Sequence, residues 1–137
     1  MRVTAPPIVS AACHCRDCQK LTGGAYSLTL ILPETGFAVV EGEPVIGGLH
    51  RAELRHHFCP RCLNWLFTRG DALPGFVNLR PTMLEDSSWL IPYIETKTAE
   101  RLPGAITGAK VPYEGWPPPE DFARLAEEFA REGARPA

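Results

Sequence analysis

The stretch CHCRDCQKLTGG, residues 13–24, places three of the five cysteines of the chain within six residues. Thiol side chains this close together can reach a common point from a single loop. The two glycines that end the stretch, Gly23 and Gly24, tolerate the positive φ that terminates a helix. We therefore expect residues 13–24 to form a cysteine-bearing loop followed by at most one helical turn, with a strand directly after it.

Length and charge limit the kinds of partner that the chain can have. It has 137 residues, a formal net charge of −2 at pH 7 and a pI near 6.1. This length fits a single domain over residues 1–137, with a core at about 5–98 followed by a C-terminal extension. The balanced charge gives no field that attracts nucleic acid or an anionic membrane, and we expect neither partner.

The cellular compartment follows from apolar runs and cysteine usage. The longest candidate run, LTLIL at residues 28–32, is too short to span a membrane, and the N-terminal residues lack the apolar core of a signal peptide. We therefore expect a cytoplasmic protein. In a reducing compartment, closely spaced cysteines hold metal or take part in chemistry more often than they form structural disulfides.

Short β-branched and aromatic runs separated by Gly and Pro predict a mainly β chain. Strands are expected at residues 26–32, 37–42, 49–58, 63–68, 75–79 and 89–95. The first two are expected to pair antiparallel across a short loop, and the CPRC turn at 59–62 to form the tip of a hairpin. Pro92 interrupts the last strand, which favours a sheet edge for it.

The C-terminal residues have a different pattern. Apolar side chains recur at helical spacing over residues 120–132, with acidic residues in the first turn and Arg131 near the end. One amphipathic helix is therefore expected to close the chain.

The C-x-C-x-x-C spacing of Cys13, Cys15 and Cys18 suits zinc, which prefers thiolate ligands at tetrahedral corners. Three protein ligands leave the fourth corner open, as in a catalytic zinc site. A small thiol can bind there as its thiolate because the metal stabilises the deprotonated form. Three thiolates also give the ion a net negative surrounding, so Arg16 and Lys20 are candidates for charge complement or for contact with a bound thiol.

A second interpretation uses a different set of cysteines. Cys15 and Cys18 together with Cys59 and Cys62 have the spacing of a zinc ribbon with one closed site of four cysteine ligands. The protein would then be a structural or protein-interaction module without catalysis, and Cys13 would be spare.

Two histidines near these cysteines are not expected to bind metal. His14 lies between two cysteines and is a candidate for a ligand or for a neighbour of the ligands, but a loop histidine is more often solvated, so we expect it to lie outside the site. The alternation of residues 52–58 turns His56 inward, which favours a core histidine with satisfied hydrogen bonds over a catalytic base.

With CHCRDCQKLTGGAY followed by HHFCPRC, the sequence resembles the glutathione-dependent formaldehyde-activating enzyme family, whose domain is shared with centromere protein V. The resemblance covers roughly residues 5–95. It implies a β-tent of antiparallel sheets with two zinc sites. It also implies that Cys13, Cys15 and Cys18 hold the zinc that is tied to glutathione, and that Cys59 and Cys62 belong to a structural zinc site.

The sequence departs from the family pattern at this second site. The family has an N-terminal C-x-C motif that supplies the other two ligands, and no cysteine precedes Cys13 here. The family also has Gly after the second cysteine of the pair, where the turn needs positive φ, whereas this chain has Leu63. We expect Cys59 and Cys62 to be the remnant of a structural zinc site, although a true start further upstream, or His57 with a neighbouring chain, would complete it.

The resemblance implies a zinc-dependent carbon–sulfur lyase type of protein. It would bind glutathione or another small thiol and act on its formaldehyde adduct, S-hydroxymethylglutathione. Because thiols add to formaldehyde without help, the protein could be a carrier instead of an enzyme. A relative with a changed thiol or aldehyde substrate is a further alternative.

Overall fold

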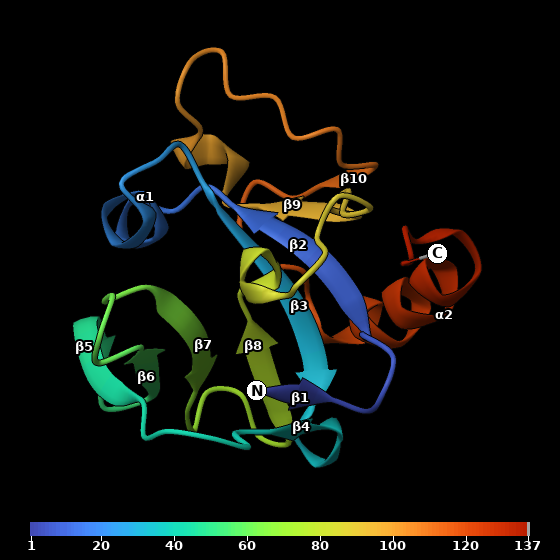
Figure 1. Cartoon of the computed structure of the whole chain (residues 1–137). Coiled ribbons are helices and arrows are strands. Elements are labelled where there is room, and N and C mark those ends of the chain that lie inside the picture. Colours follow the sequence, from blue (N-terminus) through green and yellow to red (C-terminus); the bar gives the residue numbers. More distant parts are fainter. Residues whose placement is uncertain (137) are drawn as a thin grey trace.

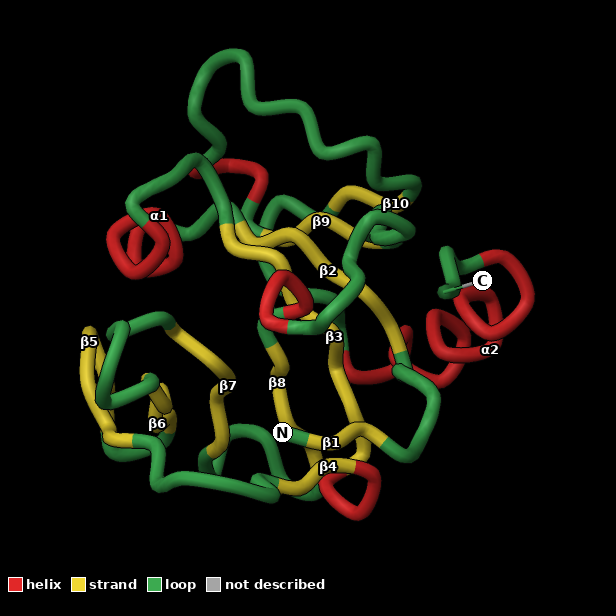
Figure 2. The backbone as a smooth tube through the Cα atoms, viewed as in Figure 1, coloured by secondary structure: helices red, strands yellow, loops and turns green. Residues whose placement is uncertain are grey.

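The computed structural model describes residues 1–136, apart from the side chain of His50. Over these residues the chain is mainly β, with two sheets and one C-terminal α-helix, as the sequence predicts (Figures 1 and 2). The larger sheet has, in this described part, eight strands in the order β10-β9-β2-β3-β8-β7-β6-β5. The smaller sheet pairs β1 (Arg2–Val3) with β4 (Phe37–Ala38).

The strands of the larger sheet are β2 (Val9–Cys13), β3 (Ser27–Pro33), β5 (Val45–Arg51), β6 (Leu54–Phe58), β7 (Trp65–Arg69), β8 (Phe76–Leu79), β9 (Ile94–Thr96) and β10 (Val111–Pro112). Short 3₁₀ helices lie at Glu34–Gly36, Pro81–Met83, Thr98–Glu100 and Pro119–Asp121. The pairings from β2 through β3, β8, β7 and β6 to β5 are antiparallel.

The two faces of the larger sheet differ in polarity because side chains alternate along each strand. On one face the buried side chains are apolar and form a core cluster of Leu30, Leu32, Phe37, Phe67, Val77 and Leu79. On the other face, Thr29 of β3 and Asn78 of β8 line a cleft instead. The period-2 pattern thus gives the sheet one core face and one face that is available for a site.

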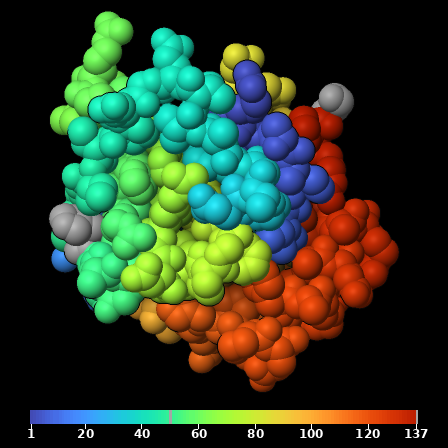
Figure 3. Space-filling model, turned by 90° about the horizontal axis from the view of Figure 1, so that it is seen from below, coloured from blue at the N-terminus to red at the C-terminus, as the bar shows by residue number. Residues whose placement is uncertain are grey.

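The C-terminal helix α2 (Phe122–Glu132) confirms the expected amphipathic helix. Leu125 and Phe129 are fully buried and share a core cluster with Val9 of β2 and Ile94 of β9. Each such side chain contributes roughly 1.5–3 kcal/mol by burial. Figure 3 shows this segment, orange to red, lying against the blue N-terminal segment. No helix within residues 1–136 is long and apolar enough to cross a membrane.

The expectation of at most one helical turn after the cysteines is wrong. Helix α1 (Arg16–Thr22) has seven residues. Its N-cap is Cys15, whose Sγ accepts a hydrogen bond from the backbone N–H of Cys18 at 3.3 Å. This bond takes the place of the usual Ser or Asp cap. A cysteine is not among the usual capping residues, so the sequence pattern did not indicate a helix start at this position. Gly23 ends the helix with φ of 62°, as expected.

The expected antiparallel pair of residues 26–32 and 37–42 does not form. β3 pairs with β2 and β8, while only Phe37–Ala38 is a strand and it pairs with β1. The 3₁₀ helix Glu34–Gly36 redirects the chain between them. The short loop is therefore a connection between two sheets and not a hairpin turn.

The single strand expected from Leu49 to Cys59 is two strands. β5 ends at Arg51 and β6 begins at Leu54, which pairs with Arg51 across a two-residue turn. The expected hairpin at CPRC does form, between β6 and β7.

The expected strand 89–95 is shorter and lies elsewhere in the sheet. β9 starts only at Ile94, after Pro92, and lies between β2 and β10 with both pairings parallel. Pro92 shortens the strand without placing it at an edge, because the residues that pair follow the proline.

Candidate metal centre

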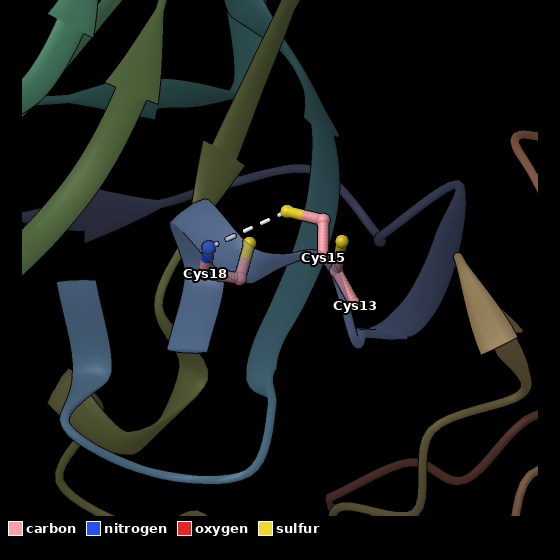
Figure 4. Close-up of side chains that lie close together, drawn as sticks. All are labelled: Cys13, Cys15 and Cys18. Atoms are coloured by element: carbon pink, nitrogen blue, oxygen red, sulfur yellow. Dashed lines mark hydrogen bonds between the residues drawn. The ribbon is translucent and has the colours of Figure 1, made fainter. Parts of the chain in front are cut away.

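Cys13, Cys15 and Cys18 lie together where β2 passes into α1. Their Sγ atoms are all within 4.8 Å of one another (Figure 4). Cys13 is buried at the end of β2, and the other two are half-buried. The strand fixes Cys13, the N-cap fixes Cys15 and the first helical turn brings Cys18 back toward both.

The three thiols share their protons unequally. The S–H groups of Cys13 and Cys18 donate to Cys15, which holds the pKa of the Cys15 thiol far below its ordinary value. The same sulfur–sulfur hydrogen bonds, together with burial, raise the pKa of the Cys13 and Cys18 thiols. The cluster therefore favours one thiolate flanked by two thiols.

These donors fit a thiolate-binding metal ion. Zn–S bonds of about 2.3 Å in a tetrahedron place sulfur atoms roughly 3.8 Å apart, and the sulfur atoms of the cluster, within 4.8 Å of one another, suit that spacing. Among the described side chains, no fourth His, Cys, Asp or Glu joins the group. The cluster can hold a metal ion through three protein ligands with one corner left over.

His14 is buried and not solvated, which corrects the expectation for this loop residue. It is 0% exposed, and its Nε2 lies 3.1 Å from Oε2 of Glu95 on β9. Glu95 also accepts from Thr107 Oγ1 at 2.8 Å and pairs with Arg101. Burial opposes ionisation of Glu95, but the bonds from Thr107 and His14 and the charge of Arg101 outweigh it and lower the pKa of Glu95. His14 therefore ties the cysteine loop to β9 while neither of its nitrogens joins the sulfur cluster.

A second set of bonds ties α1 to the 3₁₀ helix Thr98–Glu100. The Gln19 side-chain N–H donates to the backbone oxygens of His14 at 2.7 Å and of Glu100 at 3.0 Å. The Glu100 carboxylate accepts from the backbone N–H of Arg16 at 2.9 Å. The cysteine-bearing segment is thus braced from β9 and the residues that follow it.

The cysteine cluster lines a cleft of about 850 Å³. Residues from strands near both ends of the larger sheet line the cleft, including Leu54 of β6 and Thr96 of β9. Arg16 also lines it, whereas Lys20 is exposed and does not. This volume is in the range of small-molecule binding sites.

Arg80, just after β8, is the cation that the sequence did not single out. It lines the cleft and is 6% exposed. Burial lowers the pKa of Arg80 to about 10, while negative charge in the sulfur cluster acts in the opposite direction. Arg80 therefore stays protonated at neutral pH beside the sulfur cluster. The only sequence signal was its position two residues after Asn78, on the polar face of an alternating strand.

Comparison with protein families gives one result that covers most of the chain. The model of the glutathione-dependent formaldehyde-activating enzyme (GFA) family matches residues 1–100. The chain belongs to the GFA family. Comparison with curated proteins found no match.

The C-terminal residues of this GFA-family chain contribute to the cleft although they lie beyond the match. Trp116, Pro117 and Phe122 line it. The backbone N–H of Lys97 donates to Gly115 O at 2.8 Å, which fixes this segment beside β9. One wall of the cleft thus comes from residues outside the matched region.

Cys59 and Cys62 do not join the sulfur cluster. Among the residues described, no third metal-binding side chain forms a group with them. Backbone hydrogen bonds shape their turn: Leu63 N–H donates to Cys59 O at 2.9 Å, and backbone N–H groups of Cys62 and Arg61 lower the pKa of the Cys59 thiol. Leu63 has φ of 58°, the positive value that the turn was expected to need.

His56 is a core histidine, as expected. It is 7% exposed, and its Nδ1 lies 2.8 Å from Thr68 Oγ1. Its ring packs edge-on against Trp65, with ring centroids 5.0 Å apart.

Proposed function

We propose that this protein holds one zinc ion through Cys13, Cys15 and Cys18 and binds a small thiol, glutathione or a relative of it, at the remaining corner. Its reaction would be the making or breaking of the carbon–sulfur bond in the formaldehyde adduct of that thiol. GFA family membership supports this reaction class.

The observation that carries the proposal is the grouping of three sulfur atoms within 4.8 Å in the wall of the cleft. A closed structural site needs a fourth protein ligand, and no other described residue supplies one. A corner that faces a cleft of this size is available to an external ligand.

The chemistry needs a thiolate next to an aldehyde carbon. The sulfur lone pair forms a bond to the carbonyl carbon, the carbonyl oxygen takes up a proton, and the product is the S-hydroxymethyl thioether; the reverse steps release formaldehyde. A bound zinc ion would supply Lewis acidity and keep the thiol deprotonated at neutral pH.

The residues of the chain position and balance this chemistry. The brace from Glu95 and Gln19 holds the three cysteines in place, which keeps the geometry fixed before a ligand arrives. The cationic Arg80 offsets the negative charge that three protein thiolates and a ligand thiolate bring together.

Two measurements on the zinc-loaded protein test the proposal. Calorimetry measures glutathione binding, with Cys18→Ser as the variant that removes a sulfur ligand. Exchange NMR measures how fast S-hydroxymethylglutathione and formaldehyde interconvert with and without protein. We expect binding that is lost in Cys18→Ser, together with exchange faster than in free glutathione. Binding without acceleration would make the protein a carrier, and absence of binding would refute the proposal.

A further inference from the structure

The cations that line the cleft differ in how their charges are balanced. Arg51 pairs with Asp17 at 3.2 Å, and Lys97 pairs with Glu100 at 3.2 Å. The Arg16 side chain is exposed, so water solvates it. Arg80 is buried, and no described carboxylate lies within ion-pair distance of it. Negative charge in the sulfur cluster acts on Arg80, but no described anion is hydrogen-bonded to its guanidinium, and a ligand carboxylate would supply that partner.

The guanidinium of Arg80 is held in one orientation. Its Cζ lies 4.0 Å from the centre of the Trp65 ring. The indole N–H of Trp65 in turn donates to Thr68 Oγ1 at 3.1 Å, so the ring itself is fixed. With the described residues the guanidinium makes one hydrogen bond, a long one from Nη2 to the backbone oxygen of Asn78 at 3.4 Å. Most of its five N–H donors are left for another partner.

In the described part of the chain, two buried side-chain atoms on β8 and directly after it lack hydrogen-bond partners. Within the described residues, Nε of Arg80 and Oδ1 of Asn78 are both shielded from solvent and make no hydrogen bond. The two residues are separated by one position along the chain, so they lie on the same face, and both line the cleft. Buried polar groups in native proteins are nearly always hydrogen-bonded, so this donor and this acceptor are available to a ligand that enters the cleft.

We propose that Arg80 and Asn78 recognise a carboxylate and a neighbouring amide N–H on the thiol ligand, the arrangement found at the C-terminus of a peptide. The planar fork of Arg80 accommodates a carboxylate with two parallel N–H donors, and the Asn78 oxygen accepts from the amide. Arg80 and Asn78 are then the residues that select a thiol with a free carboxylate over one without it. This inference rests on the proposed function, because the thiol is what brings the ligand to the cleft.

The competing role for Arg80 is that of a counter-ion to the sulfur cluster alone. A counter-ion strengthens the binding of every thiol equally, because it acts on the shared thiolate. A carboxylate receptor strengthens the binding of acids only. The unpartnered Asn78 oxygen favours the receptor, since a counter-ion has no use for a neighbouring acceptor.

The test uses two thiols that differ only in the carboxylate: mercaptoacetylglycine and mercaptoacetylglycinamide. Their affinities for the zinc-loaded protein are measured by calorimetry in the wild type, Arg80→Met, Arg80→Lys and Asn78→Leu. Arg55→Met, a partly exposed arginine that does not line the cleft, is the matched control. Zinc content is measured on every variant.

We expect the wild type and Arg55→Met to bind the acid roughly 10- to 100-fold more tightly than the amide. Arg80→Met should bind both equally, at unchanged zinc content, and Arg80→Lys should recover part of the preference. Asn78→Leu should weaken both ligands about equally, since both carry the amide N–H.

A preference that survives in both Arg80 variants would overturn the inference. The inference would also be overturned if Arg80→Met weakened the acid and the amide by the same factor, so that their affinity ratio stayed at the wild-type value. Arg80 would then be a counter-ion. If Arg80→Met loses zinc, two measurements still test the inference: the affinity ratio of acid to amide in Arg80→Lys and the same ratio in the wild type. A wild-type ratio near one also overturns the inference. Failure of both thiols to bind zinc-loaded wild type would refute the proposed function itself.

Discussion

The chain carries two short cysteine segments, and they differ in what surrounds them. In residues 13–18 three sulfur atoms meet within 4.8 Å and β9 braces the loop through Glu95. In residues 59–62 two cysteines lie at the tip of a hairpin, Cys62 exposed, with no third ligand among the described residues. In both segments hydrogen bonds lower the pKa of one cysteine thiol, which favours the thiolate form that binds metal. The comparison teaches that close spacing along the chain brings some metal ligands together, and that the surrounding fold decides whether the remaining ligands lie near them.

The largest expected difference between the two segments is their response to loss of metal. A metal that binds only the folded state stabilises it by its binding free energy. We expect a chelator to lower the Tm of the zinc-loaded wild type by roughly 10 °C or more. Cys62→Ser should respond in the same way, whereas Cys13→Ser should show no chelator effect. Thermal unfolding followed by circular dichroism measures this, and a Cys62→Ser variant indifferent to chelator would contradict the comparison.

The pH dependence of zinc affinity gives the second test. The pKa of the Cys15 thiol is lowered, so it is ionised at pH 7, while the raised pKa values of the Cys13 and Cys18 thiols keep these protonated. Zinc binding should then release about two protons, and its apparent affinity should rise about 100-fold for each pH unit. Calorimetry in buffers of different ionisation enthalpy counts the protons, and a pH-independent affinity would place the zinc elsewhere.

Removing the charge of Glu95 tests how much its contacts with His14 and Arg101 stabilise the first cysteine segment. Glu95→Gln keeps the shape but removes the charge that faces His14 and Arg101, so we expect a loss of about 2 kcal/mol in unfolding free energy at pH 7. Zinc affinity should fall about 10-fold. Denaturant unfolding measures the first effect and chelator competition the second.

The sign of the pH effect provides the check on this brace. The folded state lowers the pKa of Glu95, so its stabilisation is complete above the unfolded value of about 4.3 and is lost as pH falls through the lower folded value. The difference between wild type and Glu95→Gln should therefore shrink in acid. Glu127→Gln, an exposed residue on α2, is the control and should change neither quantity.

The smallest expected effects concern a residue with positive φ, which follows each of the two cysteine segments. Gly23 and Leu63 have φ values of 62° and 58°. Gly23→Ala should destabilise the fold by about 1 kcal/mol, and Leu63→Gly should stabilise it by about 0.5–1 kcal/mol, because the Leu63 side chain is 69% exposed and buries little. Denaturant unfolding of both variants measures this. Opposite signs are the expected result, and equal signs would show that strain does not separate the two turns.

The sequence predicted those features that depend on local pattern. The mainly β fold, the CPRC hairpin and the α2 helix follow from residue periodicity, and the grouping of Cys13 with its two neighbours follows from spacing. The length of α1 was underestimated because the sulfur of Cys15 acts as the cap.

Features that depend on long-range contacts were beyond the sequence. β9 inserts beside β2 from more than 80 residues away, and that pairing brings Glu95 to His14. Arg80 becomes part of the site for the same reason. It follows β8, and β8 lies near the cysteine-bearing end of β2 because β3 pairs with both strands. No local pattern marks a residue whose partners arrive from other strands.

The most direct test of the central claim is the zinc content per chain, by elemental analysis, of the wild type, of Cys13→Ser and of the double variant Cys59→Ser, Cys62→Ser. The account predicts one zinc in the wild type, one in the double variant and none in Cys13→Ser. Loss of the zinc in the double variant, with retention in Cys13→Ser, would contradict it and favour a closed ribbon site.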